Sequence, residues 1–120
     1  MIMQLFYYSR TRNTKRFIDK LESDIDSFSI TEAHPQGSFI LITPTYNFGQ
    51  IPEEVVDFLE QYGNSLVGVI SCGNKNWGSA FGQAGNKIAD RYDVPLLHKL
   101  ELSGNKKDKE IVDKAIKSML

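Results

Sequence analysis

The chain has 120 residues, 41% hydrophobic and 24% charged, a composition typical of one folded domain spanning residues 1–120. Its formal net charge of −1 excludes the broad basic surface that nucleic-acid binding needs, and also the strong acidity of a carrier that docks by charge alone. Cys72 is the only cysteine, no apolar run reaches membrane-spanning length, and the N-terminus lacks a signal-peptide pattern. We therefore expect a cytoplasmic protein.

The first stretch, residues 3–14, passes from an apolar strand into a turn rich in hydroxyl groups. Residues 5–8 (LFYY) have the character of a strand, and the spacing of apolar residues predicts a helix over 14–22. The turn between them carries six polar or basic side chains: Ser9, Arg10, Thr11, Arg12, Asn13 and Thr14. The N–H groups at a helix start attract anions, so this turn is a candidate phosphate site. Ordinary helix capping explains the same residues equally well, and this stretch alone leaves both interpretations open.

Neither common glycine-rich phosphate motif occurs in this turn. The dinucleotide fingerprint of three spaced glycines is missing, and so is the Walker pattern that ends in Gly-Lys-Ser/Thr. A mononucleotide-type phosphate is therefore favoured over a dinucleotide or a triphosphate.

Strand-like and helix-like segments alternate along the rest of the chain. Further strands are expected over residues 28–30 (a short edge strand), 39–42, 66–72 and 94–102. Further helices are expected from Pro52 to Gly63, over residues 81–92, and from Asp108 onward. The last helix has an apolar face formed by Ile111, Val112, Ala115, Ile116 and Met119.

Five strands alternating with four helices predict a flavodoxin-like, doubly wound α/β fold. Its five-stranded parallel sheet would have the order 2-1-3-4-5, with helices on both faces. Ligands of such sheets bind at the carboxyl ends of the strands, near the point where the strand order reverses. Three loops with unusual chemistry leave strand ends here: residues 9–14, 43–50 and 73–78. We expect these loops to meet at one edge of the sheet.

The second and third loops combine aromatic rings with glycines and amides. Tyr46, Phe48 and Trp77 offer flat apolar faces. Glycines that allow close approach and amides that pair with ring nitrogens accompany them: Gly49, Gly73, Gly78, Asn47, Asn74 and Asn76. A phosphate pocket beside an aromatic slot suits flavin mononucleotide (FMN). Trp77 alone is somewhat better explained as a packing residue, but its place beside two glycines favours contact with the ligand.

Five segments carry a resemblance to a known family. They are SRTRNTKRF (9–17), FILITPTYNFGQIP (39–52), VDFL (56–59), GNKNWG (73–78) and LELSG (100–104). With them the chain resembles, over nearly its whole length, the NrdI family of small flavodoxin-like FMN proteins associated with class Ib ribonucleotide reductase. GNKNWG and LELSG are much more specific than the phosphate loop.

The resemblance implies an FMN whose reduced form reacts with oxygen to give an oxidant, superoxide or peroxide. That oxidant would be delivered to the small, radical-bearing subunit of class Ib ribonucleotide reductase, for assembly of its dimanganese–tyrosyl radical cofactor. A second partner would be a flavodoxin reductase or another electron donor, which the sequence does not identify. The role is that of a redox-activating protein rather than a conventional turnover enzyme.

Two other functions compete with this one. A generic flavodoxin, carrying electrons between reductases and acceptors, is the alternative, although the near-neutral charge counts against electrostatic steering. A receiver-like signalling module needs acidic residues after the first and third strands, where this chain has Ser9 and Thr43. That option is nearly excluded.

The resemblance also implies the cofactor-binding residues. The phosphate would be held by Ser9, Thr11, Asn13 and Thr14, with Arg10 and Arg12 beside them. The flavin rings would be bordered by Thr43, Pro44, Thr45, Tyr46, Asn47, Phe48 and Gly49, and flanked on the other side by Gly73, Asn76, Trp77 and Gly78, with Leu102 near the rim. Neither a catalytic side chain nor a metal ligand is implied, because the chemistry takes place on FMN.

Arg12 departs from the family pattern, which usually has glycine between Thr and Asn in the first loop. If that position needs a positive φ, arginine costs on the order of 1 kcal/mol or more. Alternatively, the loop is reshaped and the guanidinium pairs with the phosphate. We predict that Arg12→Gly still binds FMN.

The remaining reactive side chains fit structural roles. Cys72 ends an expected buried strand, and Gly78 stands where a phosphatase-type cysteine would need an arginine, so a structural thiol is favoured over a redox one. His34 and His98 lie on different elements without suitably spaced partners, so we expect no metal site. Lys106, Lys107 and Lys109 are expected to form a solvated patch, with a docking role left open.

Overall fold

The computed structural model describes residues 3–9, 12–23, 25–45, 49–74, 78, 81–101 and 103–119. Its strands are β1 (Gln4–Tyr7), β2 (Asp26–Ser29), β3 (Phe39–Pro44), β4 (Leu66–Gly73) and β5 (Leu96–Glu101). Its helices are α1 (Asn13–Lys20), α2 (Glu53–Tyr62), α3 (Gln83–Tyr92) and α4 (Lys106–Met119), with a short 3-10 turn, η1 (Gly63–Ser65), after α2. The strands form one parallel sheet in the order β2-β1-β3-β4-β5, which confirms the predicted topology.

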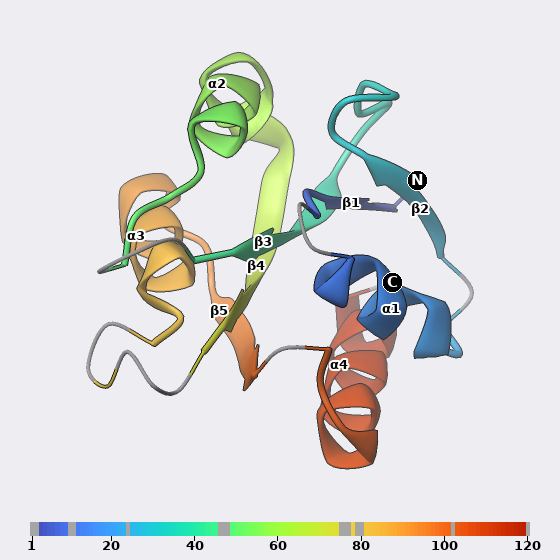
Figure 1. The fold of residues 1–120 in the computed structure, drawn as a ribbon. Coiled ribbons are helices and arrows are strands. Elements are labelled where there is room, and N and C mark those ends of the chain that lie inside the picture. The colour runs from blue at the N-terminus through green and yellow to red at the C-terminus, as the bar shows by residue number, and fades with distance from the viewer. Residues whose placement is uncertain are drawn as a thin grey trace.

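Helices cover both faces of the sheet (Figure 1). Successive side chains of a strand point to opposite faces, so each strand contributes to two separate cores. Leu5 of β1 belongs to the core under α1 and α4, where Phe17 and Val112 are fully buried. Phe6 belongs to the core under α2 and α3, with Phe58. None of the helices in the described part of the chain qualifies as a membrane span.

The central strand β3 is buried along almost its whole length. Its residues from Phe39 to Thr43 are fully buried, because β1 and β4 flank it and helices cover both faces. The continuous apolar run of the sequence therefore predicted its environment correctly. Phe39 also packs edge-on against Phe6 (5.6 Å between ring centroids) and Phe58 (5.7 Å), which ties α2 to the sheet.

The last helix differs from its prediction in two ways. It begins at Lys106 rather than at Asp108, because Asn105 and Asp108 cap it reciprocally: each side chain accepts the other's backbone N–H at 2.9 Å. Val112 and Ile116 face the core as expected, but Ile111 is 37% exposed. An α-helix turns about 100° per residue, so the buried stripe at positions 112 and 116 leaves position 111 at its margin.

Gly63 follows the last residue of α2, as predicted, but it is not a left-handed helix cap. Its φ is −58°, so no left-handed conformation demands glycine there. Instead, a Cβ at this position would lie 2.3 Å from Cε1 of Tyr92, which is impossibly close. The ring of Tyr92 occupies the space that a side chain at position 63 would need, so glycine is required there.

Gly85 allows α3 to approach the sheet closely, and we expect Gly85→Ala to destabilise the protein. The added Cβ would lie 2.5 Å from Cβ of Ser71 and 2.8 Å from Cδ1 of Leu96. Overpacking of this kind costs about 1–3 kcal/mol, more than the roughly 1 kcal/mol that alanine gains over glycine in a helix. Urea unfolding measures the difference, with the exposed neighbour Asn86→Ala as the control. A Gly85→Ala protein as stable as the wild type would contradict this account of the packing.

Candidate cofactor site at the carboxyl ends of the strands

The three polar loops start from three neighbouring strands. β3 lies between β1 and β4, and the parallel register pairs Tyr7 with Ile42 and Thr43 with Ser71. The N–H of Tyr8, just past β1, continues this pairing by donating to the Ile42 carbonyl at 3.2 Å. Because the three strands are adjacent and parallel, the loops that follow residues 8, 44 and 73 all leave from the same edge of the sheet.

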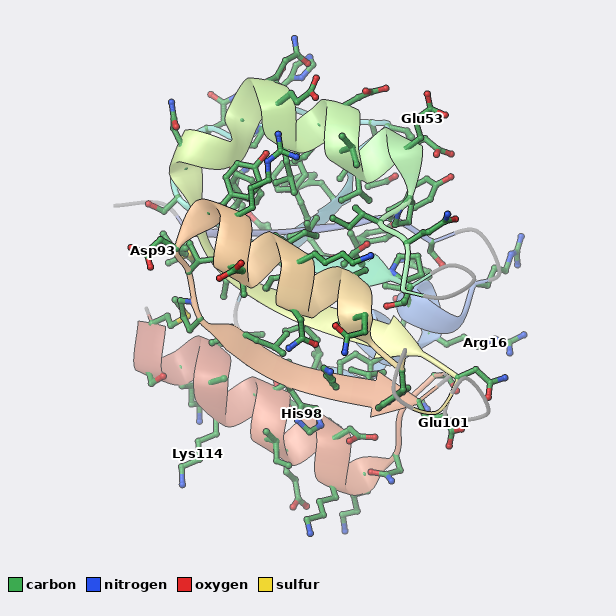
Figure 2. The ribbon with its side chains drawn as sticks, turned by 90° about the vertical axis from the view of Figure 1, so that its left-hand side faces the viewer. Arg16, Glu53, Asp93, His98, Glu101 and Lys114 are labelled. Carbon is green, nitrogen blue, oxygen red and sulfur yellow. The ribbon has the colours of Figure 1, made fainter. Side chains whose placement is uncertain are left out.

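Helix starts lie at the same end of the molecule. Figure 2 shows Glu53, the first residue of α2, and Arg16, in the first half of α1, on the side where β5 ends at Glu101. Asp93, which follows the last residue of α3, lies at the opposite end (Figure 2). The rim thus combines strand carboxyl ends with the N-terminal ends of helices, where N–H groups and helix dipoles favour anions.

Arg12 caps α1 in the left-handed conformation. Its φ is 68° and its ψ is −4°, and its carbonyl accepts the N–H of Arg16 at 2.9 Å. The sequence left open whether Arg12 has a positive φ or the loop is reshaped. The structure has the positive φ, so arginine occupies a conformation that favours glycine. The Arg12 side chain is exposed. The first N–H groups of α1, at Asn13 and Thr14, have no partner within the helix because of the geometry of a helix start.

Ser9 and Thr14 make different contributions to this loop. The Ser9 hydroxyl lies beside the helix start, where its oxygen accepts the N–H of Lys15 at 3.4 Å. Thr14 is only 2% exposed, and its hydroxyl points into the core, 3.8 Å from Sγ of Cys72. In this structure, Thr14 therefore offers a ligand its backbone N–H rather than its hydroxyl.

Cys72 belongs to β4 and is buried in the core beside α1, as expected for a structural thiol. Burial raises the pKa of the Cys72 thiol to about 12, against a smaller lowering by the hydrogen bond from Thr14. A thiol with this pKa stays protonated at neutral pH and is a poor nucleophile.

The described ends of the second loop are polar and tightly held. Thr43 is fully buried, and its hydroxyl donates to the Pro44 carbonyl at 3.0 Å. The Thr45 hydroxyl lies 3.2 Å from that of Ser71 and accepts the N–H of Ala84, in the first turn of α3, at 3.4 Å. Gly49, near the other end, has a φ of 92°, a conformation that favours glycine.

The third loop contains two glycines that serve different purposes. Gly73 ends β4, and a Cβ there would lie 3.1 Å from the backbone nitrogen of Gly82. Gly78 has a φ of 58°, and no atom of another described residue lies within 4 Å of where its Cβ would be. Gly78 is therefore bare, exposed backbone that a flat ligand could approach closely.

Part of the predicted site lies outside the described residues. These positions are Arg10, Thr11, Tyr46, Asn47, Phe48, Asn76, Trp77 and Leu102, and for Asn13 only the backbone is described. Their roles stay predictions from the sequence.

Two features of the rim were missed at the sequence level. The ring of Tyr8 is buried in the core under α2 and α3, and its hydroxyl donates to the Glu54 carboxylate, which links the end of β1 to the first turn of α2. Ser71, a fully buried hydroxyl in β4, connects β4 to Thr45 and to α3. A serine inside the otherwise apolar run LVGVISC is the signal that could have identified it.

His98 has a carboxylate partner that the sequence spacing did not indicate. Its Nε2 lies 2.7 Å from Oδ1 of Asp108, across β5 and the first turn of α4. In the described part of the chain, no three His, Cys, Asp or Glu side chains gather as metal ligands.

Lys109 was expected to be solvated, but its Nζ lies 3.2 Å from Oε1 of Glu22 and 3.3 Å from Oδ2 of Asp113.

A parallel 2-1-3-4-5 sheet, with polar loops leaving β1, β3 and β4 at one rim, defines a flavodoxin-like protein. The chain belongs to the NrdI flavodoxin-like family, whose model matches residues 5–114. It is 36% identical to Protein NrdI of Bacillus licheniformis over 119 residues, which cover 99% of this chain and 91% of the relative. The family expected from the sequence is thereby confirmed.

Solved flavodoxins share the fold at lower identity. A short-chain flavodoxin associated with a non-canonical PDU bacterial microcompartment has a TM-score of 0.73 at 20% identity, with 95% of this chain and 93% of that chain covered. A Fusobacterium nucleatum flavodoxin bound to flavin mononucleotide has a TM-score of 0.71 at 17% identity, with 98% and 96% covered.

Proposed function

We propose that this chain binds FMN at the rim formed by β1, β3 and β4. Its strongest support is the match of residues 5–114 to the NrdI flavodoxin-like family, together with three polar loops that leave adjacent strands. The same fold holds flavin mononucleotide in the F. nucleatum flavodoxin. The residues present fit a flat phosphorylated ligand, because a helix start and exposed glycine backbone occur at one rim.

The start of α1 would hold the phosphate. The N–H groups of Asn13 and Thr14, which have no partner within the helix, would donate to phosphate oxygens, and the helix dipole would favour the negative charge. The Ser9 hydroxyl lies beside this start and offers a further donor. The exposed Arg12 adds a positive charge to the rim.

The second and third loops would border the flavin rings. Gly78 would let the backbone approach the rings, and Thr45, fixed between β4 and α3, would provide a polar contact. Asn47 and Trp77 are proposed from the sequence as ring contacts.

Bound FMN would supply the redox chemistry, taking electrons from a donor protein and passing them to oxygen to give superoxide or peroxide. The protein would direct that oxidant to the small subunit of class Ib ribonucleotide reductase, for assembly of its dimanganese–tyrosyl radical cofactor. The association with this reductase is taken from the family resemblance, and a cytoplasmic location follows from such a partner. The chain's part is to grip the phosphate, orient the rings and present the rim.

The first test is the visible spectrum of the purified protein, followed by mass identification of whatever dissociates on denaturation. We expect the flavin spectrum and the mass of FMN. A colourless protein that does not bind added FMN either would exclude the proposal.

The second test mixes the reduced protein with oxygen and a manganese-loaded class Ib small subunit, and measures the tyrosyl radical by electron paramagnetic resonance. Radical formation that depends on this chain is expected.

A generic electron-carrying flavodoxin is the alternative, favoured by the structural likeness to flavodoxins. It predicts electron transfer to unrelated acceptors and no radical in the second test. The 36% identity to Protein NrdI, against 20% or less to the flavodoxins compared here, favours the first proposal.

Arg12→Gly is expected to keep FMN bound and to raise the stability of the free protein by up to about 1 kcal/mol. Glycine relieves the left-handed strain at φ 68°, while the N–H groups of α1 still bind the phosphate. The thermal midpoint of the free protein and the FMN stoichiometry are the measurements. Arg12→Val, β-branched, serves as the control and should lose stability. Complete loss of FMN from Arg12→Gly would mean that the guanidinium is indispensable.

A further inference from the structure

We propose that Ser71 is a positioning residue that couples the second ring-bordering loop, through Thr45, to the start of α3, an inference that rests on the proposed FMN site. Ser71 belongs to β4 and is fully buried, so it touches no ligand itself. Its influence would pass through hydrogen bonds to Thr45 and to Gly82 and Gly85 at the start of α3.

The hydrogen bonds of Ser71 use all of its capacity. Its hydroxyl donates to the Gly82 carbonyl at 2.9 Å, and its oxygen accepts the N–H of Gly85 at 3.1 Å. A serine hydroxyl has one proton and two lone pairs. Since the proton is directed to Gly82, the contact of 3.2 Å with Thr45 requires Thr45 to be the donor.

This arrangement fixes the direction of the Thr45 hydroxyl. Its proton is committed to Ser71, and one of its lone pairs accepts the N–H of Ala84 at 3.4 Å. Its contacts with the described residues leave one lone pair. Thr45 can therefore only accept a hydrogen bond from a ligand, which selects a ligand N–H or O–H group at that position.

Gly82, the partner of Ser71, is held from a second side. Its φ is 66°, and the Lys99 side chain of β5 packs so closely that a Cβ on Gly82 would lie 2.8 Å from Cδ of Lys99. Lys99 Nζ also donates to the Phe81 carbonyl at 3.2 Å. The start of α3 is thus fixed to β4 and β5, and Ser71 passes that position on to Thr45 in the second loop.

The test is a double-mutant cycle on FMN affinity, measured by quenching of flavin fluorescence. Ser71→Ala and Thr45→Val are each expected to weaken FMN binding by about tenfold, the effect of one lost hydrogen bond. The double variant should be no weaker than either single one, because Ser71 acts through Thr45. Thr45→Ser keeps the hydroxyl and should bind FMN almost like the wild type.

Val112→Ala is the matched control, since Val112 belongs to α4 and is fully buried on the opposite face of the sheet. It should lower the thermal midpoint without changing FMN affinity or the visible circular dichroism of the bound flavin, whereas Ser71→Ala and Thr45→Val should change both. In the free protein, Ser71→Ala should speed amide exchange at Ala84, whose partner Thr45 is no longer held.

Additive losses in the double variant would overturn the coupling. So would a Ser71→Ala protein whose FMN affinity falls no further than that of Val112→Ala. A wild-type chain that binds no FMN would overturn the proposed function alone, and the Ala84 exchange rate would then decide the coupling: an unchanged rate in Ser71→Ala would refute it.

Discussion

Ser9→Asp is expected to weaken FMN binding by about 100-fold while leaving the fold intact. Ser9 lies beside the start of α1, where its oxygen accepts the Lys15 N–H. A carboxylate can accept the same N–H and interacts favourably with the helix dipole, so stability should hold or rise by about 0.3–1 kcal/mol. It would also repel the phosphate: two like charges about 5 Å apart cost on the order of 3 kcal/mol at an effective dielectric constant near 20.

Ser9→Asn is the matched control, because asparagine has nearly the same shape as aspartate but carries no charge. The dissociation constants of FMN and of riboflavin, which lacks the phosphate, should be measured for both variants. We expect Ser9→Asp to lose FMN affinity but to keep the riboflavin affinity of the wild type, and Ser9→Asn to change little. Undiminished FMN binding by Ser9→Asp would place the phosphate away from the start of α1.

Cys72 should make the protein lose stability steeply in alkali. The folded thiol has a pKa of about 12 because it is buried, against an ordinary value of 9.0. Below pH 9 the thiol is protonated in both states, and its contribution to stability is fully present. Between pH 9 and pH 12 the unfolded chain ionises first, so the free energy of unfolding falls by up to about 1.4 kcal/mol per pH unit.

The comparison is between the wild type and Cys72→Ala, unfolded in urea at several pH values from 7 to 11. Cys72→Ala should be less stable at pH 7, because the substitution leaves a cavity and removes the contact with Thr14. Its stability should then fall less steeply above pH 9 than that of the wild type. Lysines and tyrosines titrate in both proteins and cancel in the difference. Parallel curves would show that the folded thiol ionises normally.

The structure agrees with the sequence on the position of some predicted site residues but not on the direction of their side chains. Ser9 and Arg12 were identified from composition and position alone, and the structure places both at the start of α1. Thr14 was chosen for its hydroxyl, but that hydroxyl faces Cys72, 58 positions further along the chain. Local patterns indicate that a helix starts here. They do not indicate which side of that helix meets the sheet, because that depends on the packing of distant strands.

Ser71 illustrates the same limit. Nothing in the sequence around it links a serine of β4 to Thr45 or to the N–H of Gly85, and yet these contacts connect the second loop of the rim to α3. Similarly, Gly63 was read as a helix end, and the structure shows that Tyr92 needs the space. Contacts between residues far apart in sequence decide both cases.

The sequence by itself determined the order of elements, the doubly wound sheet and the family, because apolar periodicity and turn residues act locally and the family segments are contiguous. Only the tertiary structure decided which hydroxyls face the rim and which face the core, why Gly63 and Gly85 lack side chains, and how Thr45 is oriented. Those features arise where separate elements pack to van der Waals contact, and close packing between distant segments leaves no local periodic trace.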